Sequence, residues 1–378
     1  MNGNELNRPQ PSDLLTLSSL ILDSLNDGVY VCDRNRTIVY WSRSAERITG
    51  WTADDVVGRR CLDDVLCHID KDNHQLCGEE FCPLHRSIVT GGTSTVPLIV
   101  FAQGKNGGRI PMQVSVSPIR NAQGEIIGGV ETFRDMSTVL ADLERAKRIQ
   151  LLSLEQDLPD DPRVRFSTFY TPHDIVGGDY YAIRPLGADH YGFLLADVMG
   201  HGVAAALHTM HVSSLSERFF PLLAEPARFA AAVNNELAKV VKDESFATAV
   251  CGAIDVRRRT VRFAAAGGPP AIVFRPGGAV EPLESSGLPF GMMSDATYDE
   301  AEAQLGEGDT LLMFSDGAFE IHDAQGEQLG IAGLIRILKQ LGYPARKFEP
   351  AALEEALLKF SNAIRLDDDL TFIEVRFL

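Results

Sequence analysis

The feature that most constrains the fold of this chain is a series of four aspartates, each at or beside the end of an apolar run of strand length. The four are Asp179, Asp197, Asp316 and Asp368. A side chain at the end of a strand is held rigidly at the rim of a sheet. We therefore expect a layered β structure in which the rims of several strands bring these carboxylates together.

Converging carboxylates without Cys or His indicate a site for hard cations that prefer oxygen ligands, such as Mg²⁺ and Mn²⁺. A pair of these cations can activate water against a phosphate ester. The pattern therefore predicts a metal-dependent hydrolase.

Length and charge narrow the class of protein. The chain of 378 residues is long enough for two domains. No apolar run approaches the roughly 20 residues that are needed to span a bilayer. The N-terminus lacks a signal-peptide pattern, so we expect a cytoplasmic protein with no membrane partner. A net charge of -17 argues against nucleic acid as the main partner.

The first third of the chain predicts an α+β sensor sheet. A polar lead-in, expected to be disordered, covers 1–13 and a helix follows to about residue 25. Strands are expected at 28–32, 37–41, 96–101, 110–118 and 126–133, with helices after the second strand. Two segments resemble the PAS family, which implies a PAS sensor domain over 14–137: DSLNDGVYVCDRNRTIVYWSRSAERITGW and GEIIGGVETFRDMS.

A helical linker is predicted at 138–158. Apolar residues from Val139 to Leu152 form one stripe among charged residues. The stripe is compatible with a helix packed on its own chain and with a parallel two-chain coiled coil. Linkers of similar PAS–phosphatase proteins form the second, so we favour a homodimer.

The remaining residues, 159–378, alternate strand-like and helical runs. Strands are expected at 164–170, 179–184, 191–198, 247–255, 260–266, 271–275, 310–314 and 370–377, and helices at 203–219, 226–242, 331–340 and 350–364. Hairpin turns between strands indicate antiparallel sheets. The expected architecture is an α/β sandwich of two antiparallel sheets flanked by helices.

Over 145–378 the motifs resemble the metal-dependent protein phosphatase (PPM) family in its SpoIIE/RsbU bacterial branch. In chain order they are Gly177-Gly178-Asp179-Tyr180-Tyr181, Asp197-Val198-Met199-Gly200-His201-Gly202, Ala266-Gly267-Gly268-Pro269-Pro270, Gly287-Leu288-Pro289-Phe290-Gly291, Ser315-Asp316-Gly317 and Asp368-Asp369-Leu370-Thr371. Each motif alone is common, but their order together is specific. The first also resembles the diguanylate cyclase signature, but Tyr180 and Tyr181 do not supply the carboxylate and Phe that it needs.

The resemblance implies the roles of the site residues. Asp197 would bridge two Mn²⁺ or Mg²⁺ ions, with the Val198 carbonyl completing one shell. Asp316 and Asp368 would hold the first ion and Asp179 the second. Asp369 is the alternative to Asp368, whereas Asp367 is expected to face solvent.

The implied reaction is direct attack of a metal-bridging hydroxide on phosphoserine or phosphothreonine, without a covalent intermediate. The implied substrate is a STAS-type anti-anti-sigma phosphoprotein of a bacterial partner-switching pathway. The alternative function is a non-catalytic docking module with the same fold, which the retention of all four carboxylates argues against.

Three positions depart from the family pattern. Ala182 replaces a common Asp, Gly268 replaces a His, and Met199 stands where eukaryotic relatives have a His suited to protonating the leaving group. His201 is either that acid or a plain helix-start residue. The general acid stays unassigned.

Four cysteines lie within 22 residues of the sensor domain, in the spacing Cys-x5-Cys-x9-Cys-x4-Cys, which matches no standard zinc or ferredoxin pattern. They either pack as small apolar side chains or form a metal, iron–sulfur or redox site. The preferred ligands for zinc or an iron–sulfur cluster are Cys61, His68, Cys77 and Cys82. Cys67 competes with His68 for this role.

Overall fold

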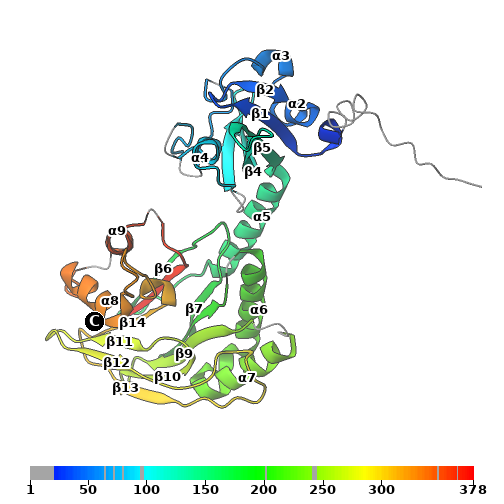
Figure 1. Cartoon of the computed structure of the whole chain (residues 1–378). Coiled ribbons are helices and arrows are strands. Elements are labelled where there is room, and N and C mark those ends of the chain that lie inside the picture. The colour runs from blue at the N-terminus through cyan, green and yellow to red at the C-terminus, as the bar shows by residue number, and fades with distance from the viewer. Residues whose placement is uncertain are drawn as a thin grey trace, which may run out of the picture. The chain divides into compact units, whose positions relative to one another are not determined.

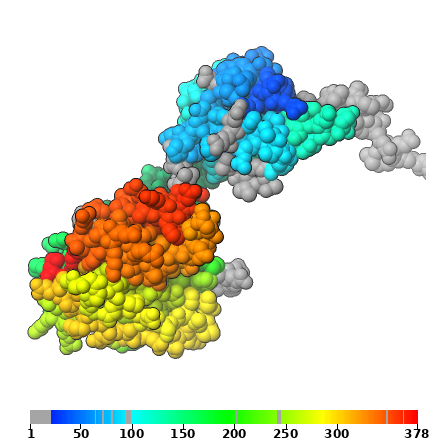
Figure 2. Space-filling model, turned by 60° about the vertical axis from the view of Figure 1, so that its left-hand side comes forward, coloured from blue at the N-terminus to red at the C-terminus, as the bar shows by residue number. Residues whose placement is uncertain are grey.

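The computed structural model describes residues 21–63, 65–70, 73–78, 81–93, 98–200, 202–240, 245–346, 349–363 and 365–378. The chain divides into two compact units, Met1–Asp142 and Leu143–Leu378, and each forms a packed body of its own (Figure 2). None of the helices in the described part of the chain has the length and apolar character of a membrane span. The lead-in predicted at 1–13 lies outside the described residues.

The first unit is built on a five-stranded antiparallel sheet in the order β2-β1-β5-β4-β3. The strands are β1 Gly28–Asp33, β2 Ile38–Trp41, β3 Leu98–Gln103, β4 Arg109–Arg120 and β5 Ile126–Asp135. Helices α2 Arg43–Thr49, α3 Ala53–Val56 and α4 Pro83–Thr90 all lie between the second and third strands in the chain. This arrangement confirms the predicted PAS sensor sheet, although α3 and α4 had not been located from the sequence.

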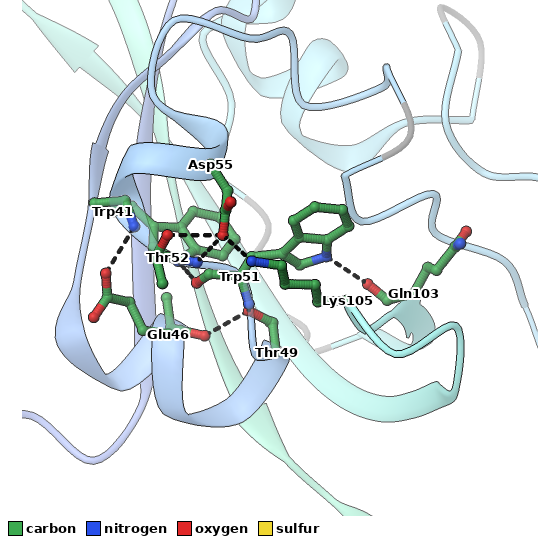
Figure 3. A network of polar contacts seen from close by, with 10 residues as sticks. Trp41, Glu46, Thr49, Trp51, Thr52, Asp55, Gln103 and Lys105 are labelled. Carbon is green, nitrogen blue, oxygen red and sulfur yellow. Dashed lines mark hydrogen bonds and ion pairs between the residues drawn. The ribbon is translucent and has the colours of Figure 1, made fainter.

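Polar contacts around Trp51 join α2 and α3 to the end of β3 (Figure 3). The Trp41 indole N–H donates to the Trp51 carbonyl at 3.0 Å, and the Trp51 indole N–H donates to the Gln103 carbonyl at 3.3 Å. Asp55 accepts from the backbone N–H of Thr52 at 2.9 Å and forms an ion pair with Lys105 at 2.6 Å. The α2–α3 corner is therefore capped and fixed to the β3–β4 turn.

The second unit contains two five-stranded antiparallel sheets, in the orders β13-β10-β9-β8-β7 and β12-β11-β14-β15-β6. The strands of the first sheet are β7 Asp179–Gly187, β8 His190–Val198, β9 Ala247–Asp255, β10 Thr260–Ala266 and β13 Ala301–Gln304. Those of the second are β6 Val164–Thr171, β11 Ala271–Phe274, β12 Val280–Leu283, β14 Thr310–Phe314 and β15 Leu370–Phe377. The short edge strands β12 and β13 had not been predicted.

Strand alternation distributes the core over three layers. On β8, Phe193 and Leu195 pack between the sheets with Met313 of β14, whereas Leu194 packs on the opposite face. Helices α6 Val203–Phe219 and α7 Pro226–Val240 cover that face, and α8 Gly330–Gln340 and α9 Pro350–Ser361 cover the outer face of the second sheet (Figure 1). The result is the predicted α/β sandwich.

Helix α5, Ser137–Leu154, corresponds to the predicted linker. Its last residue, Leu154, is buried in the helix-side core of the second unit. Val139, Ile149 and Leu152 of its apolar stripe are 47%, 58% and 67% exposed. The division at 138 and 158, and the homodimer, stay predictions.

Candidate active site

Two of the predicted site residues face each other across neighbouring strands. Asp179, the first residue of β7, is the register partner of Asp197, near the end of β8. The Cβ atoms of directly opposed residues lie roughly 4.5–5.5 Å apart. Both carboxylates therefore project from one face at one end of this sheet.

Asp179 is fully buried and reaches the other sheet. Its Oδ2 accepts a hydrogen bond from the Thr371 hydroxyl on β15, while its Oδ1 has no partner among the described residues. Burial, followed by the charge of Asp369, raises the pKa of Asp179 well above its usual range. A buried carboxylate oxygen without a donor is costly unless a cation or a proton compensates it.

Asp316 and Asp368 come from two paired strands of the second sheet. Asp316 begins the short 3₁₀ turn η2, Asp316–Ala318, immediately after β14, and Asp368 precedes β15. Gly317 permits this approach, since a Cβ there would lie 2.1 Å from the Asp369 carbonyl oxygen. Asp316 Oδ1 is also buried without a described partner. Burial raises the pKa of Asp368 to about 6, against a hydrogen bond from the backbone of Asp369 and with repulsion from Asp316.

Asp197 connects the two pairs electrostatically. Burial raises the pKa of Asp197 well above its usual range, and the charges of Asp179, Asp316 and Asp368 raise it further. The four predicted aspartates, two from each sheet, therefore lie within range of one another's charge, a proximity that their spacing in the sequence does not indicate. A bound cation would relieve the repulsion between these negative charges.

The loop before β7 leaves space beside this cluster. A Cβ on Gly178 would lie 2.7 Å from the Val198 carbonyl oxygen and 3.6 Å from Asp197 Oδ1. Gly200 and Gly202, with φ of 91° and 80°, then turn the chain into α6 in a conformation that favours glycine. His201 lies outside the described residues.

The donor set fits Mg²⁺ or Mn²⁺ in its chemistry. The donors are carboxylate and carbonyl oxygens, two of the buried carboxylate oxygens have no hydrogen-bond partner in the described part of the chain, and Gly178 leaves the Val198 carbonyl uncovered by a side chain. Within the described ranges, no group of three or more His, Cys, Asp or Glu side chains is arranged so that it could hold a metal ion as it stands. Small side-chain adjustments would have to accompany binding.

Asp369 has a different structural role from Asp368. Its Oδ1 accepts from the backbone N–H of His173 at 2.6 Å, and its Oδ2 accepts from those of Gly178 and Asp179 at 2.5 and 3.1 Å. Asp369 is buried, whereas Asp368 and Asp367 are exposed. Because both oxygens of Asp369 already hold the loop before β7, Asp368 is the better candidate ligand. This structural role of Asp369 was not predicted from the sequence.

Two further residues that sequence reasoning missed fix the same loop. The Gln150 side chain of α5 donates to the Gly177 carbonyl at 2.6 Å and accepts from the Gly177 N–H at 3.1 Å. The Thr209 hydroxyl of α6 donates to the Gly178 carbonyl at 2.8 Å. The backbone that presents Asp179 is therefore held from two helices. No local sequence signal marks these partners.

The structure places the predicted sensor ligands in and around the core of the first unit. Cys61 and Cys82 are buried there, and Cys77 Sγ accepts from the His68 backbone N–H at 3.1 Å. The His68 ring instead faces Glu131, with Nε2 and Oε1 3.6 Å apart. Burial raises the pKa of the Cys77 thiol to about 12, which disfavours the thiolate that a metal requires. Cys67 is half-buried, at a φ of 42°. The zinc or iron–sulfur site stays a prediction.

Family comparisons match both units. The model of Stage II sporulation protein E (SpoIIE) matches residues 187–378, and a PAS fold model matches residues 22–141. Phosphoserine phosphatase RsbP of Bacillus subtilis is 28% identical over 183 residues, which is 47% of this chain and 45% of RsbP. Stage II sporulation protein E of the same organism is 27% identical over 53% of this chain and 24% of its own length. The chain thus spans less than half of these two relatives.

A third relative is matched over most of its length. Phosphoserine phosphatase RsbU of Bacillus subtilis is 22% identical over 305 residues, 80% of this chain and 88% of RsbU. Among solved structures, the SiaA-PP2C domain of Pseudomonas aeruginosa has a TM-score of 0.54 at 23% identity, covering 64% of this chain and 98% of that one. The PP2C phosphatase domain of SpoIIE from Bacillus subtilis, with a fragment of its regulatory domain, has a TM-score of 0.50 at 19% identity, covering 76% and 81%. The second unit therefore has the PP2C fold.

Proposed function

This chain belongs to the SpoIIE family, and from that premise we propose that it is a metal-dependent protein phosphatase that hydrolyses phosphoserine or phosphothreonine under the control of its PAS domain. The proposal is supported by the mutual charge effects of four carboxylates from two sheets, and by buried oxygens of Asp179 and Asp316 that have no hydrogen-bond partner among the described residues. Two relatives named phosphoserine phosphatases support the substrate class.

The four aspartates are the proposed holders of two Mn²⁺ or Mg²⁺ ions. Asp197 would contribute to both ions, Asp316 and Asp368 would hold one, Asp179 would hold the other, and the Val198 carbonyl would supply a further oxygen. When bound, such a pair supplies an activated water and neutralises phosphate oxygens. Without metal, the folded chain holds these carboxylates near one another despite the repulsion between their charges, and this favours the binding of cations.

The chain's own residues position this centre. Thr371 orients Asp179 through its hydroxyl, leaving the other oxygen free. Ser315 accepts from the Thr371 N–H at 3.0 Å and donates to the Asp369 carbonyl at 3.2 Å. The two strand ends that carry Asp316 and Asp368 are therefore tied together beside the reacting centre. The proton donor to the leaving group stays unassigned.

The proposed partner is a phosphorylated STAS-type anti-anti-sigma protein in a bacterial partner-switching pathway. The support is the family resemblance, together with the similarity to RsbP and RsbU. Phosphorylated and unphosphorylated forms of such a protein, offered to the enzyme in the same reaction vessel, would show whether the phosphoprotein is recognised.

Regulation is proposed to act through the 138–158 linker. Its helix α5 carries Gln150, which holds the loop before Asp179 through both of its amide atoms. Its exposed apolar stripe is suited to pairing with the same stripe of a second chain, which gives a homodimer. Deletion of residues 1–137 is expected to change metal-saturated turnover or metal affinity, and an unchanged pair of values would remove this coupling.

The test of the function is phosphate release from a phosphoserine protein by the full chain, measured with Mn²⁺, with Mg²⁺ and with EDTA. We compare the wild type with Asp197→Asn and Asp368→Asn. The matched control is Asp367→Asn, which removes a neighbouring exposed charge outside the cluster. Metal-dependent turnover that is lost in the first two variants and kept in the control supports the two-metal hydrolase.

Turnover that persists in Asp197→Asn would refute the proposed centre. A wild type that binds the phosphoprotein but releases no phosphate with either metal would favour the non-catalytic docking module.

A further inference from the structure

A basic hollow lies in the first unit. Its volume is about 420 Å³. The lining residues are Arg34, Asn35, Arg36, Arg60 and His85. Among the described residues, three arginines and a histidine line this space and no carboxylate does, in a chain whose net charge is -17. Such a local reversal of charge attracts anions.

Arg36 is the buried arginine of this hollow. It is only 6% exposed, and its backbone is in the left-handed region at a φ of 64°, where a bulky residue is uncommon. One guanidinium N–H donates to the Gly78 carbonyl at 2.5 Å. Among the described residues no carboxylate pairs with it. Burial of a charge without a counter-charge is costly, and a bound anion would remove that cost.

The turn that carries Arg34 and Arg36 is held by hydrogen bonds. Asp33 Oδ1 accepts from the backbone N–H groups of Asn35 and Thr37, both at 2.8 Å. The Arg36 carbonyl accepts from the Cys61 N–H at 3.0 Å. The acidic side chain nearest in sequence is therefore engaged with the backbone, and the backbone that carries Arg34 and Arg36 is held in place before any ligand arrives.

A second hollow in the same unit shows the contrast. It has a volume of about 580 Å³ and is lined partly by Arg47, Lys105 and Arg109. There Lys105 is paired with Asp55 at 2.6 Å (Figure 3), and Arg109 donates to the Cys67 carbonyl at 2.8 Å. Arg34, Arg60 and His85 of the first hollow have no ion pair in the described part of the chain. Among the described residues, one of the three cations of the second hollow is therefore paired with a carboxylate, whereas none of the cations of the first is.

We propose that the hollow formed by Arg34, Arg36, Arg60 and His85 binds a small multivalent oxyanion, a molecule that carries two or more phosphate or carboxylate groups. Guanidinium groups match both kinds of oxyanion through paired N–H donors, and three of them require more than one negative charge. The site lies in the PAS domain, so it is separate from the phosphatase centre and independent of the proposed function.

The test is calorimetric titration of the full chain with inorganic pyrophosphate and, separately, with citrate. The protein and both titrants are first freed of divalent ions on a chelating resin that is removed before the titration, so that divalent ions cannot carry the ligand to the acidic cluster. We expect one site per chain with a dissociation constant of about 1 mM or lower. Arg34→Gln and Arg60→Gln change exposed side chains, so the fold should persist, and each should weaken binding about tenfold or more.

The matched control is Arg43→Gln. Arg43 is another exposed arginine of the same unit, its side chain is 79% exposed, and it lies outside the hollow. Saturation by pyrophosphate alone assigns a phosphate-bearing ligand, by citrate alone a polycarboxylate, and by both a general oxyanion site. Absence of saturation by either probe, or equal loss of binding in the control, overturns the proposal.

Discussion

The neighbouring aspartates Asp368 and Asp369 are expected to respond in opposite ways to the same isosteric change. In Asp369→Asn, one of two acceptor oxygens becomes an N–H₂ donor that faces backbone N–H groups. At least one of the three hydrogen bonds to His173, Gly178 and Asp179 must then be lost. A hydrogen bond to a charged group contributes about 1.5–3 kcal/mol.

The expected loss of unfolding free energy in Asp369→Asn is therefore about 2–4 kcal/mol. The lower end reflects relief of the repulsion that Asp369 exerts on Asp179. In Asp368→Asn the partly exposed side chain loses a charge that partial burial and Asp316 disfavour, and its remaining oxygen can still accept from the Asp369 backbone N–H. Stability without metal should then change by less than about 0.5 kcal/mol or increase slightly, while metal-dependent turnover is lost.

The assay is urea unfolding in EDTA, followed by far-UV circular dichroism for the whole chain and by tryptophan fluorescence. Both tryptophans of the chain, Trp41 and Trp51, belong to the first unit, so their transition is an internal reference that neither variant should shift. Equal stability of Asp369→Asn and wild type, or a larger loss in Asp368→Asn, would refute the assignment of the two carboxylates.

Three other variants test separate features. Burial, and then the charge of Cys61, raises the pKa of Glu131 to about 8. The contribution of protonated Glu131 to stability is therefore complete below the pKa of the unfolded chain, near 4.5, and is lost as the pH rises to 8. Between pH 6.5 and 8 stability should fall by at most about 1.4 kcal/mol per unit, and fluorescence-detected unfolding of Glu131→Gln should lack this fall. Gly178→Ala places a Cβ against the Val198 carbonyl and should lower turnover about tenfold to a hundredfold; Gly187→Ala, with open space around it, should retain turnover. Gln150→Ala removes two buried hydrogen bonds and should weaken metal binding, measured as turnover during a titration with metal. An unchanged titration curve would contradict the role of Gln150 in positioning the loop before Asp179.

The sandwich fold was largely predictable because its central strands are continuous apolar runs. Strands β9, β10, β14 and β15 begin and end at the predicted residues, since buried strands carry a strong local signal. The edge strands β12 and β13 were missed because they are short and carry exposed or polar side chains. In such strands pairing with a neighbour, rather than composition, determines the structure.

The site was predictable only in part, and the limit is physical. The four aspartates are marked by their motifs, but the partners that orient them come from distant segments. Gln150 acts on a loop 27 residues away and Asp369 on one about 190 residues away. Which of two adjacent aspartates faces the cluster depends on the pleat of β15 and on the path of the loop before it. Neither can be inferred from the letters alone.

The pairing of Asp179 with Asp197 across β7 and β8 makes the tolerance of this chain to insertions uneven. The two strands are joined by a short turn between Gly187 and His190. Because side chains alternate between the faces of a sheet, a slip of one residue would turn one carboxylate of the pair away from the other. The length of this hairpin is thus as much a requirement of the site as the identity of its aspartates. Among functional homologues, or in a library of loop insertions selected for activity, this turn should vary in sequence but not in length. The exposed turn at 121–124 of the first unit should vary in both.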